Sequence, residues 1–223
     1  MTFQDSSLRT KLSATVVVGI ALGYFEAAVV VYLRELFYPG GFSFPLEVIP
    51  MRLLIIEVCR EAASILLIAA ISVLAAQRFR DRLGYFLILF GVWDIFYYVW
   101  LKVTIDWPVS LLDWDILFLI PLPWIGPVIA PLLIANLMVG IGLAIVVVSA
   151  RQHRFHSPLI AAVLVLLGTA AILYSFMYDT AATLHQQMPR DYQYGLLAAG
   201  LIVYLAAFRL ACGRSSSRLG TED

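Results

Sequence analysis

The chain has 223 residues, of which 62% are hydrophobic and 13% are charged, and its mean hydropathy is +0.90. Soluble domains are about 25% charged and about 45–50% apolar, so the composition excludes a soluble globular protein and predicts a polytopic, all-α membrane protein. Basic and acidic residues number 15 each, so no basic excess indicates a nucleic-acid partner.

Six stretches are apolar over about 20 residues, the length of helix that crosses ~30 Å of hydrocarbon. In chain order these predicted spans are 13–36, 51–76, 83–103, 128–150, 157–179 and 193–211. We expect them to form one transmembrane helix bundle, followed by a disordered cytoplasmic tail at 213–223. The first stretch is too long for a signal peptide and lacks a cleavage pattern, so we expect it to remain in the protein.

The stretch 108–127 is apolar, but it contains Asp113 and Asp115 and four prolines. If it does not cross, most basic residues outside the spans lie on one side, which is the cytoplasmic side by the positive-inside rule. These are Arg9, Lys11, Arg78, Arg80, Arg82, Arg151, Arg154, Arg209, Arg214 and Arg218. We therefore predict a re-entrant or interfacial element on the outer side of a cell (inner) membrane, with both termini cytoplasmic.

Aromatic residues gather around this element, because all five tryptophans lie between residues 93 and 124. Tryptophan collects at the headgroup level of membranes, so one interpretation is an anchoring belt. The second interpretation is an outer gate over a buried site, in which Asp113, Trp114 and Asp115 take part. Non-helical backbone at membrane depth is tolerated only where it is buried in protein or lines a wet cavity, which favours an element that covers something.

Four acidic residues lie within the predicted spans: Glu26, Glu57, Glu61 and Asp94. An ionisable group at membrane depth costs about 2.5–3.5 kcal/mol on insertion scales and by default marks a functional site. At ~1.5 Å per residue, all four fall at a similar depth, between the middle of the bilayer and its outer half. We therefore predict that they form one proton- or cation-binding site.

Neighbouring residues supply partners for these carboxylates. Arg60 lies three residues after Glu57, close enough to pair with it, and Ser64 continues the same helix face. Tyr97 and Tyr98 follow Asp94 by about one turn and are expected to donate hydrogen bonds to it. The competing interpretation is purely structural: Arg60 pairs with both glutamates of its own helix, and the remaining two acids are neutral contacts between helices.

The charge balance favours function over structure. Four carboxylates and one guanidinium give a formal charge of −3, which a medium of low dielectric constant does not hold. Either some carboxyls are protonated, or a hard cation is bound, or a cationic substrate supplies the missing charge. The sequence names no cofactor. No histidine lies within a span, which excludes a haem held by paired intramembrane histidines, and no nucleotide-binding motif is present.

Three functions remain open. The first, which we favour, is the binding or translocation of a cation or proton, with or without a coupled small solute. The second is an intramembrane enzyme for a lipid or isoprenoid, in which Glu57 or Glu61 is the general base and Arg60 holds an anionic group. The third is a scaffold or assembly subunit. Two pairs of small residues, Gly19 with Gly23 and Gly140 with Ala144, allow close helix packing within the chain or in a homodimer.

Overall fold

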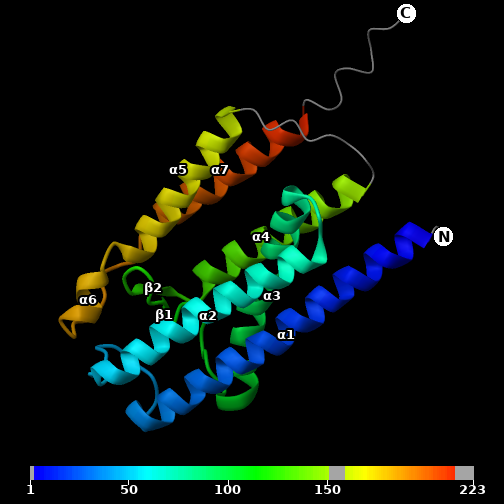
Figure 1. Ribbon diagram of the computed structural model, residues 1–223. Coiled ribbons are helices and arrows are strands. Elements are labelled where there is room, and N and C mark those ends of the chain that lie inside the picture. The colour runs from blue at the N-terminus through cyan, green and yellow to red at the C-terminus, as the bar shows by residue number, and fades with distance from the viewer. Residues whose placement is uncertain (1–2, 151–158, 214–223) are drawn as a thin grey trace, which may run out of the picture.

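The structure is a computed structural model that describes residues 3–150 and 159–213 (Figure 1). The elements are α1 (Phe3–Phe37), α2 (Met51–Ala75), α3 (Phe79–Ile105), β1 (Trp114–Phe118), β2 (Trp124–Pro127), α4 (Ile129–Ala150), α5 (Leu159–Met177), α6 (Thr180–Leu184) and α7 (Tyr194–Gly213). Each of the six predicted spans coincides with a long helix, and the short α6 was not predicted. The predicted tail beyond residue 213 and four of the arginines used to orient the chain lie outside the described residues.

Five segments are long and apolar enough to cross a membrane: Ser7–Phe37, Phe79–Ile105, Ile129–Ala150, Leu159–Leu184 and Tyr194–Ala211. The protein is therefore a multi-pass membrane protein. The predicted span at 51–76 forms α2 but is not among these five, and the first half of α2 carries Arg52, Glu57, Arg60 and Glu61.

The α2 helix has a polar inner face and an apolar outer face. Its buried residues are Glu57, Glu61, Ile68 and Ser72, which share one side of the helix. Leu66, Leu67 and Leu74 are exposed. This arrangement is the reverse of a helix on a soluble protein, and it suits a helix with lipid outside and a polar site inside.

Residues 108–127 contain a β-hairpin rather than a helix, so the expectation of an all-α fold is wrong at this element. Strands β1 and β2 pair antiparallel, with Asp115 opposite Gly126 and Ile116 opposite Ile125. Pro121 and Pro123 lie in the connecting turn, where they remove the backbone donors that a helix would need. The hairpin instead satisfies its backbone groups by strand pairing.

The α3 helix is central to one group of helices, with α1 and α4 packed against it. Small residues allow these close approaches. A Cβ atom added to Gly19 or Gly23 of α1 would lie within 3.0 Å of α3 atoms, and one added to Gly142 would lie 2.6 Å from the Gly84 carbonyl oxygen. The Gly19–Gly23 pair is thus used inside the chain, while Gly140 has open space around it.

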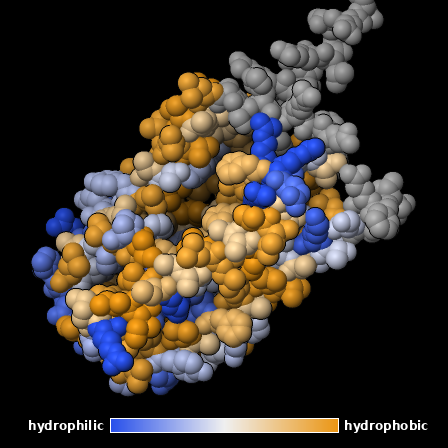
Figure 2. All heavy atoms as spheres, in the orientation of Figure 1, coloured by the Kyte–Doolittle hydropathy of each residue, from blue (hydrophilic) through white to orange (hydrophobic). Residues whose placement is uncertain are grey.

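The α5 and α7 helices form a separate pair (Figure 1). Gly168 and Gly200 face each other where the two helices meet. The pair contacts the rest of the protein mainly through β2, and Figure 2 shows a recess between it and the other helices on the visible face. Apolar residues cover most of that face, and hydrophilic residues gather toward its ends.

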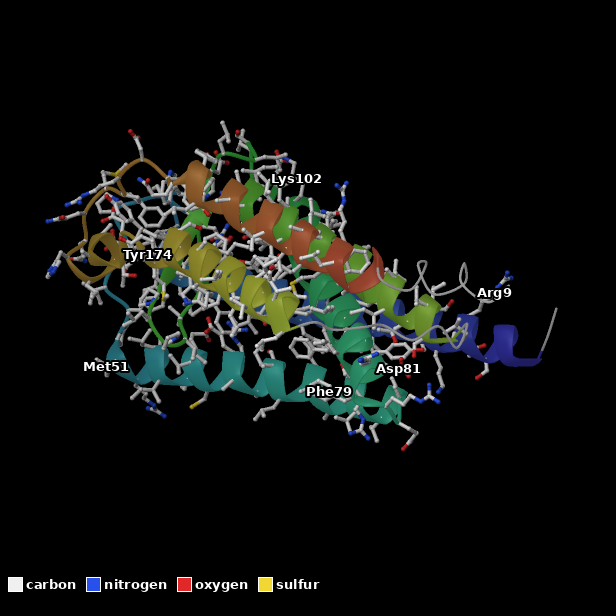
Figure 3. All side chains as sticks on the ribbon, turned by 90° about the horizontal axis from the view of Figure 1, so that it is seen from above. Arg9, Met51, Phe79, Asp81, Lys102 and Tyr174 are labelled. Atoms are coloured by element: carbon white, nitrogen blue, oxygen red, sulfur yellow. The ribbon has the colours of Figure 1, made fainter. Side chains whose placement is uncertain are left out.

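The start of α1 and the end of α7 lie at one end of the molecule, and the hairpin and α6 lie at the other (Figure 1). Seen from above, Arg9, Phe79 and Asp81 lie toward the first end, whereas Met51 and Tyr174 lie toward the second (Figure 3). The hairpin therefore covers the end opposite the one that carries Arg9.

Candidate functional site: an ionisable cavity between α1, α2, α3 and β1

A cavity of about 130 Å³ lies between α1, α2, α3 and β1, and we call it the α1–α3 cavity. The four acids Glu26, Glu57, Glu61 and Asp94 and the basic Arg60 all line it. The structure thus brings together, from three helices, the five charged residues that the sequence places at one depth. Arg34 and Asp115 line the same cavity.

Arg60 of α2 joins two carboxylates from different helices. Its Nε donates to Glu57 Oε2 at 2.8 Å, and its Nη2 lies 2.7 Å from the same oxygen. Its Nη1 donates to Glu26 Oε1 of α1. The structural interpretation of the sequence paired Arg60 with Glu57 and Glu61, and the second partner is in fact Glu26. This ion cluster links α1 to α2 across the cavity.

Glu61 binds the backbone of the hairpin instead of a basic side chain. Its Oε2 accepts a hydrogen bond from the Leu119 N–H at 2.9 Å, just after the end of β1. Glu61 is 6% exposed. The carboxylate therefore fastens the hairpin to α2 at the edge of the cavity.

Arg34, near the end of α1, holds the other side of the hairpin. Its Nη2 donates to Asp115 Oδ1 at 2.9 Å, and both side chains are buried. The guanidinium lies 4.3 Å from the centre of the Phe42 ring and 3.7 Å from that of Trp107, so cation–π attraction adds to the ion pair. Its second terminal nitrogen, Nη1, is buried and has no hydrogen-bond partner among the described residues.

Asp94 of α3 differs from the other carboxylates. Within residues 3–150 and 159–213, no hydrogen bond or ion pair engages its side chain, although it lies near enough to Glu26 and Asp115 to interact with their charges. Tyr97 and Tyr98 were expected to donate hydrogen bonds to Asp94. The Tyr97 hydroxyl instead donates to Asp115 Oδ2 at 3.4 Å, and the Tyr98 side chain also lies close to Asp115. The helix turns both tyrosines toward the hairpin rather than back toward Asp94.

Seven acidic and basic side chains therefore line the cavity. Five carboxylates and two guanidiniums give a formal charge of −3. Buried charges must be paired or neutralised, and both guanidiniums are already engaged with carboxylates. These two guanidiniums therefore leave three formal negative charges of the cavity unbalanced.

The remaining predicted residues have separate positions. Asp113 accepts the Val109 and Ser110 N–H groups at 2.8 and 3.0 Å, so it stabilises the local turn and does not line the cavity. Trp114 packs against Phe44 and Tyr192, on the side of the hairpin that faces α7. Of the three residues predicted for an outer gate, only Asp115 lines the cavity. Ser64 lies on α2 close to Glu26 of α1.

The sequence did not indicate Arg34 as a site residue, because it lies near the end of a predicted span and not at the depth of the four acids. One signal was available: a basic residue near the end of an apolar helix and an acidic residue in the predicted re-entrant element need each other if both are buried.

The described residues contain no group of three or more His, Cys, Asp or Glu side chains arranged to hold a metal ion. The carboxylates line a common space, but they are spread around it instead of converging on one point. Comparison of the chain with protein-family models, curated proteins and solved structures finds no match.

Proposed function

We propose that this protein binds a proton or a small cation in the α1–α3 cavity and passes it across the bilayer. The observation that carries the proposal is Asp94, an unpaired carboxylate in a cavity whose formal charge is −3. An unpaired acid at membrane depth gains free energy when it takes up a proton or a cation, and acids in such positions form relays in pumps and transporters. Asp94 is the group that takes up and releases the proton or cation, and Glu61 and the ion cluster of Arg60 line the same cavity.

The proposal includes six membrane crossings, with α2 as the sixth. The start of α1 and the end of α7 lie at the same end of the molecule (Figure 1). If that end lies on one side of the membrane, the chain crosses the bilayer an even number of times. The apolar outer face of α2 supports this assignment. The hairpin is then a re-entrant or interfacial element on the outer side of the inner membrane, and both termini are cytoplasmic, as the positive-inside rule favours.

The contacts of Arg60 argue against the enzymatic alternative. An enzyme for an isoprenoid phosphate or a lipid needs a guanidinium that is free to hold the anionic group. Arg60 is engaged by Glu57 and Glu26, and an added anion would enter a cavity that already has an excess of negative charge. No specific observation favours a scaffold.

The test is ion flux in vesicles that contain the purified protein. A membrane potential is imposed, and internal pH and the uptake of Na⁺ and K⁺ are followed. The wild-type protein should transport a proton or one of these cations, and Asp94→Asn should abolish the flux because the amide cannot ionise. Asp106→Asn is the matched control, since Asp106 is exposed at the end of α3 and its left-handed backbone suits asparagine.

Two outcomes contradict the proposal. One is full flux in Asp94→Asn, which would remove Asp94 from the pathway. The other is the absence of proton and cation flux in the wild-type protein, provided that circular dichroism shows a folded, inserted protein.

A further inference from the structure

We propose that the ion bound in the α1–α3 cavity is a proton, and that Glu61 is a second group that takes it up and releases it, next to the hairpin. Glu61 and Asp94 hold the proton in turn, and water in the cavity carries it between them. This inference rests on the proposed function, and it names the ion and a second residue that binds it. The contacts of the five carboxylates in the cavity carry the argument.

The charge balance of the cavity distinguishes Glu61 and Asp94 from the other acids. Three carboxylates are paired with a guanidinium, namely those of Asp115, Glu26 and Glu57. Among the described residues, Glu61 accepts only the Leu119 N–H, and Asp94 has no hydrogen bond or ion pair. A buried charge without a partner is neutralised at a gain in free energy. Protonation of these two acids therefore removes two of the three unbalanced charges.

The same contacts favour a proton over a metal ion. Hard metal ions bind several oxygen ligands at once, about six for Mg²⁺, whereas a proton needs a single carboxylate oxygen. Glu26 and Glu57 direct oxygens at Arg60, and Glu61 Oε2 is occupied by a backbone N–H. The carboxylates of the described chain are accordingly not grouped as ligands around one point. A proton fits acids that stand apart in this way.

Both acids lie near Glu26 of α1. Glu26 is close enough to interact with the charge of Asp94 and with that of Glu61, and all three line the cavity. A buried water molecule needs roughly 10–15 Å³ of space and two to four polar partners. The cavity measures about 130 Å³, so it has room for several water molecules between its charged side chains. Such water connects Glu61 to Asp94 without direct contact between them.

Each transfer step conserves the proton. On the hairpin side, the Glu61 carboxylate takes a proton from a hydronium ion and leaves a water molecule. The Glu61 carboxyl then gives the proton to water in the cavity, and that water gives a proton to the Asp94 carboxylate. The charged groups that face Glu61 are those of Glu26, Glu57 and Arg60, and those that face Asp94 are Glu26 and Asp115. The proton therefore moves between the two carboxylates that no guanidinium holds.

The first experiment identifies the ion in vesicles that contain the wild-type protein. A membrane potential is imposed, and internal pH is followed once with Na⁺ in the medium and once with N-methylglucamine in its place. The rate of proton uptake should be equal in the two media, and the uptake of Na⁺ and K⁺ should not exceed that of protein-free vesicles. Proton uptake that requires Na⁺, or Na⁺ or K⁺ uptake above that level, overturns the identity of the ion.

The second experiment separates proton transfer by Glu61 from its hydrogen bond with the hairpin. The amide oxygen of Glu61→Gln still accepts the Leu119 N–H, but the side chain no longer holds a proton. Proton flux should fall at least about tenfold, since positioned proton-transfer groups typically contribute about 10²–10⁴-fold. Glu47→Gln is the matched control and should keep its flux, because Glu47 is exposed and does not line the cavity.

Glu61→Asp gives the opposite change, because it keeps an acid but shortens the side chain that reaches the Leu119 N–H. Transfer of a proton predicts more flux in Glu61→Asp than in Glu61→Gln. A role in fastening the hairpin alone predicts the reverse order. The reverse order, or full flux in Glu61→Gln, therefore overturns the role of Glu61.

Infrared spectroscopy of the protein in lipid measures proton binding without transport. A pH titration of the wild-type protein should show the carbonyl bands of protonated carboxyls, and Glu61→Gln and Asp94→Asn should each remove one. If neither variant removes a band, the proton is not held at these residues. Both bands without any flux overturn translocation and keep the proton as the bound ion. Na⁺ or K⁺ flux that depends on Asp94, without proton flux, overturns the proton and leaves the proposed function standing.

Discussion

The polar groups that line the α1–α3 cavity include seven ionisable side chains, whereas the side chains that join α5 to α7 and to the segment before α7 are neutral hydroxyls that pair directly. Thr169 of α5 and Tyr204 of α7 share a hydrogen bond of 2.6 Å, and Ser175 is 2.9 Å from the Tyr192 hydroxyl. Neutral contacts of this kind hold helices together at a small gain, on average about 0.6 kcal/mol each. Buried ionisable groups cost far more, so they mark a candidate functional site.

The α5–α7 pair and the α1–α2 contact are also held together in different ways. The α5–α7 pair relies on backbone proximity at Gly168 and Gly200. The α1–α2 contact relies on the ion cluster of Arg60 with Glu26 and Glu57. Shape should therefore decide stability in the first region, and charge should decide it in the second.

The largest effect should follow from breaking the ion cluster. Arg60→Met leaves Glu26 and Glu57 buried without their cation, and the loss of one partner of a buried ion pair costs about 3–5 kcal/mol. We expect a strong fall in the thermal unfolding midpoint in detergent, measured by intrinsic fluorescence. The control is Lys102→Met, which removes an exposed pair with Asp106 that is worth about 0–1 kcal/mol.

A rescue variant sharpens this result. Adding Glu26→Gln and Glu57→Gln to Arg60→Met removes the uncompensated charges, so most of the lost stability should return. If the triple variant is as unstable as Arg60→Met, the cluster stabilises the fold by shape and not by charge.

The next effect should come from filling the α5–α7 contact. A Cβ atom at Gly200 would lie 2.5 Å from Ile172 Cγ1, so Gly200→Ala forces the helices apart and should cost about 1–3 kcal/mol. Gly195 lies on the same helix with open space around it, and Gly195→Ala should leave the unfolding midpoint unchanged or slightly raised. Equal midpoints for the two variants would contradict the close packing of α5 and α7.

A smaller, pH-dependent effect is expected at Tyr192, which lies between the hairpin and α5. Burial raises the pKa of Tyr192 to about 12, while its hydrogen bond with Ser175 acts in the opposite direction. An unfolded tyrosine titrates near pH 10, so the unfolded chain loses this proton first as pH rises. The stability that Tyr192 contributes is therefore fully present below about pH 10 and is lost as pH rises toward about 12.

Tyr192→Phe tests this dependence, because phenylalanine has no proton to lose. Between about pH 9 and about pH 12, the unfolding midpoint of the variant should fall less than that of the wild-type protein. Parallel pH profiles would show that Tyr192 does not titrate differently in the folded and unfolded states.

The smallest effect should come from Tyr204→Phe, which removes the hydroxyl that pairs with Thr169. We expect a loss near 0.6 kcal/mol, the average for such contacts within membranes. The measurement is the unfolding midpoint together with ion flux, and the flux should not change. A loss of flux in this variant would show that the α5–α7 pair takes part in transport and would end the separation of the two regions.

The helices could be predicted because hydropathy reports directly on membrane-length segments. Counting residues from the helix ends also placed Glu26, Glu57, Glu61 and Asp94 at one depth, and the structure brings them to one cavity. The local pairing of Arg60 with Glu57 followed from helix geometry alone.

The tertiary partners could not be predicted. Arg60 takes Glu26 instead of Glu61, which depends on how α1 and α2 are rotated about their own axes. Arg34 and Asp115 are 81 residues apart, and only the folded hairpin brings them together. The hairpin itself was missed because its two strands have five and four residues and lie among prolines, where no periodic pattern can develop.

The strand β1 is attached to all three helices that enclose the cavity. Asp115 binds Arg34 of α1 and Tyr97 of α3, and the Leu119 N–H that follows the strand binds Glu61 of α2. If one of these helices moves relative to the other two, at least one of these attachments must lengthen. A helix movement that widens the α1–α3 cavity therefore also loosens the hairpin that covers it, so the volume of the cavity and the attachment of the hairpin are mechanically coupled.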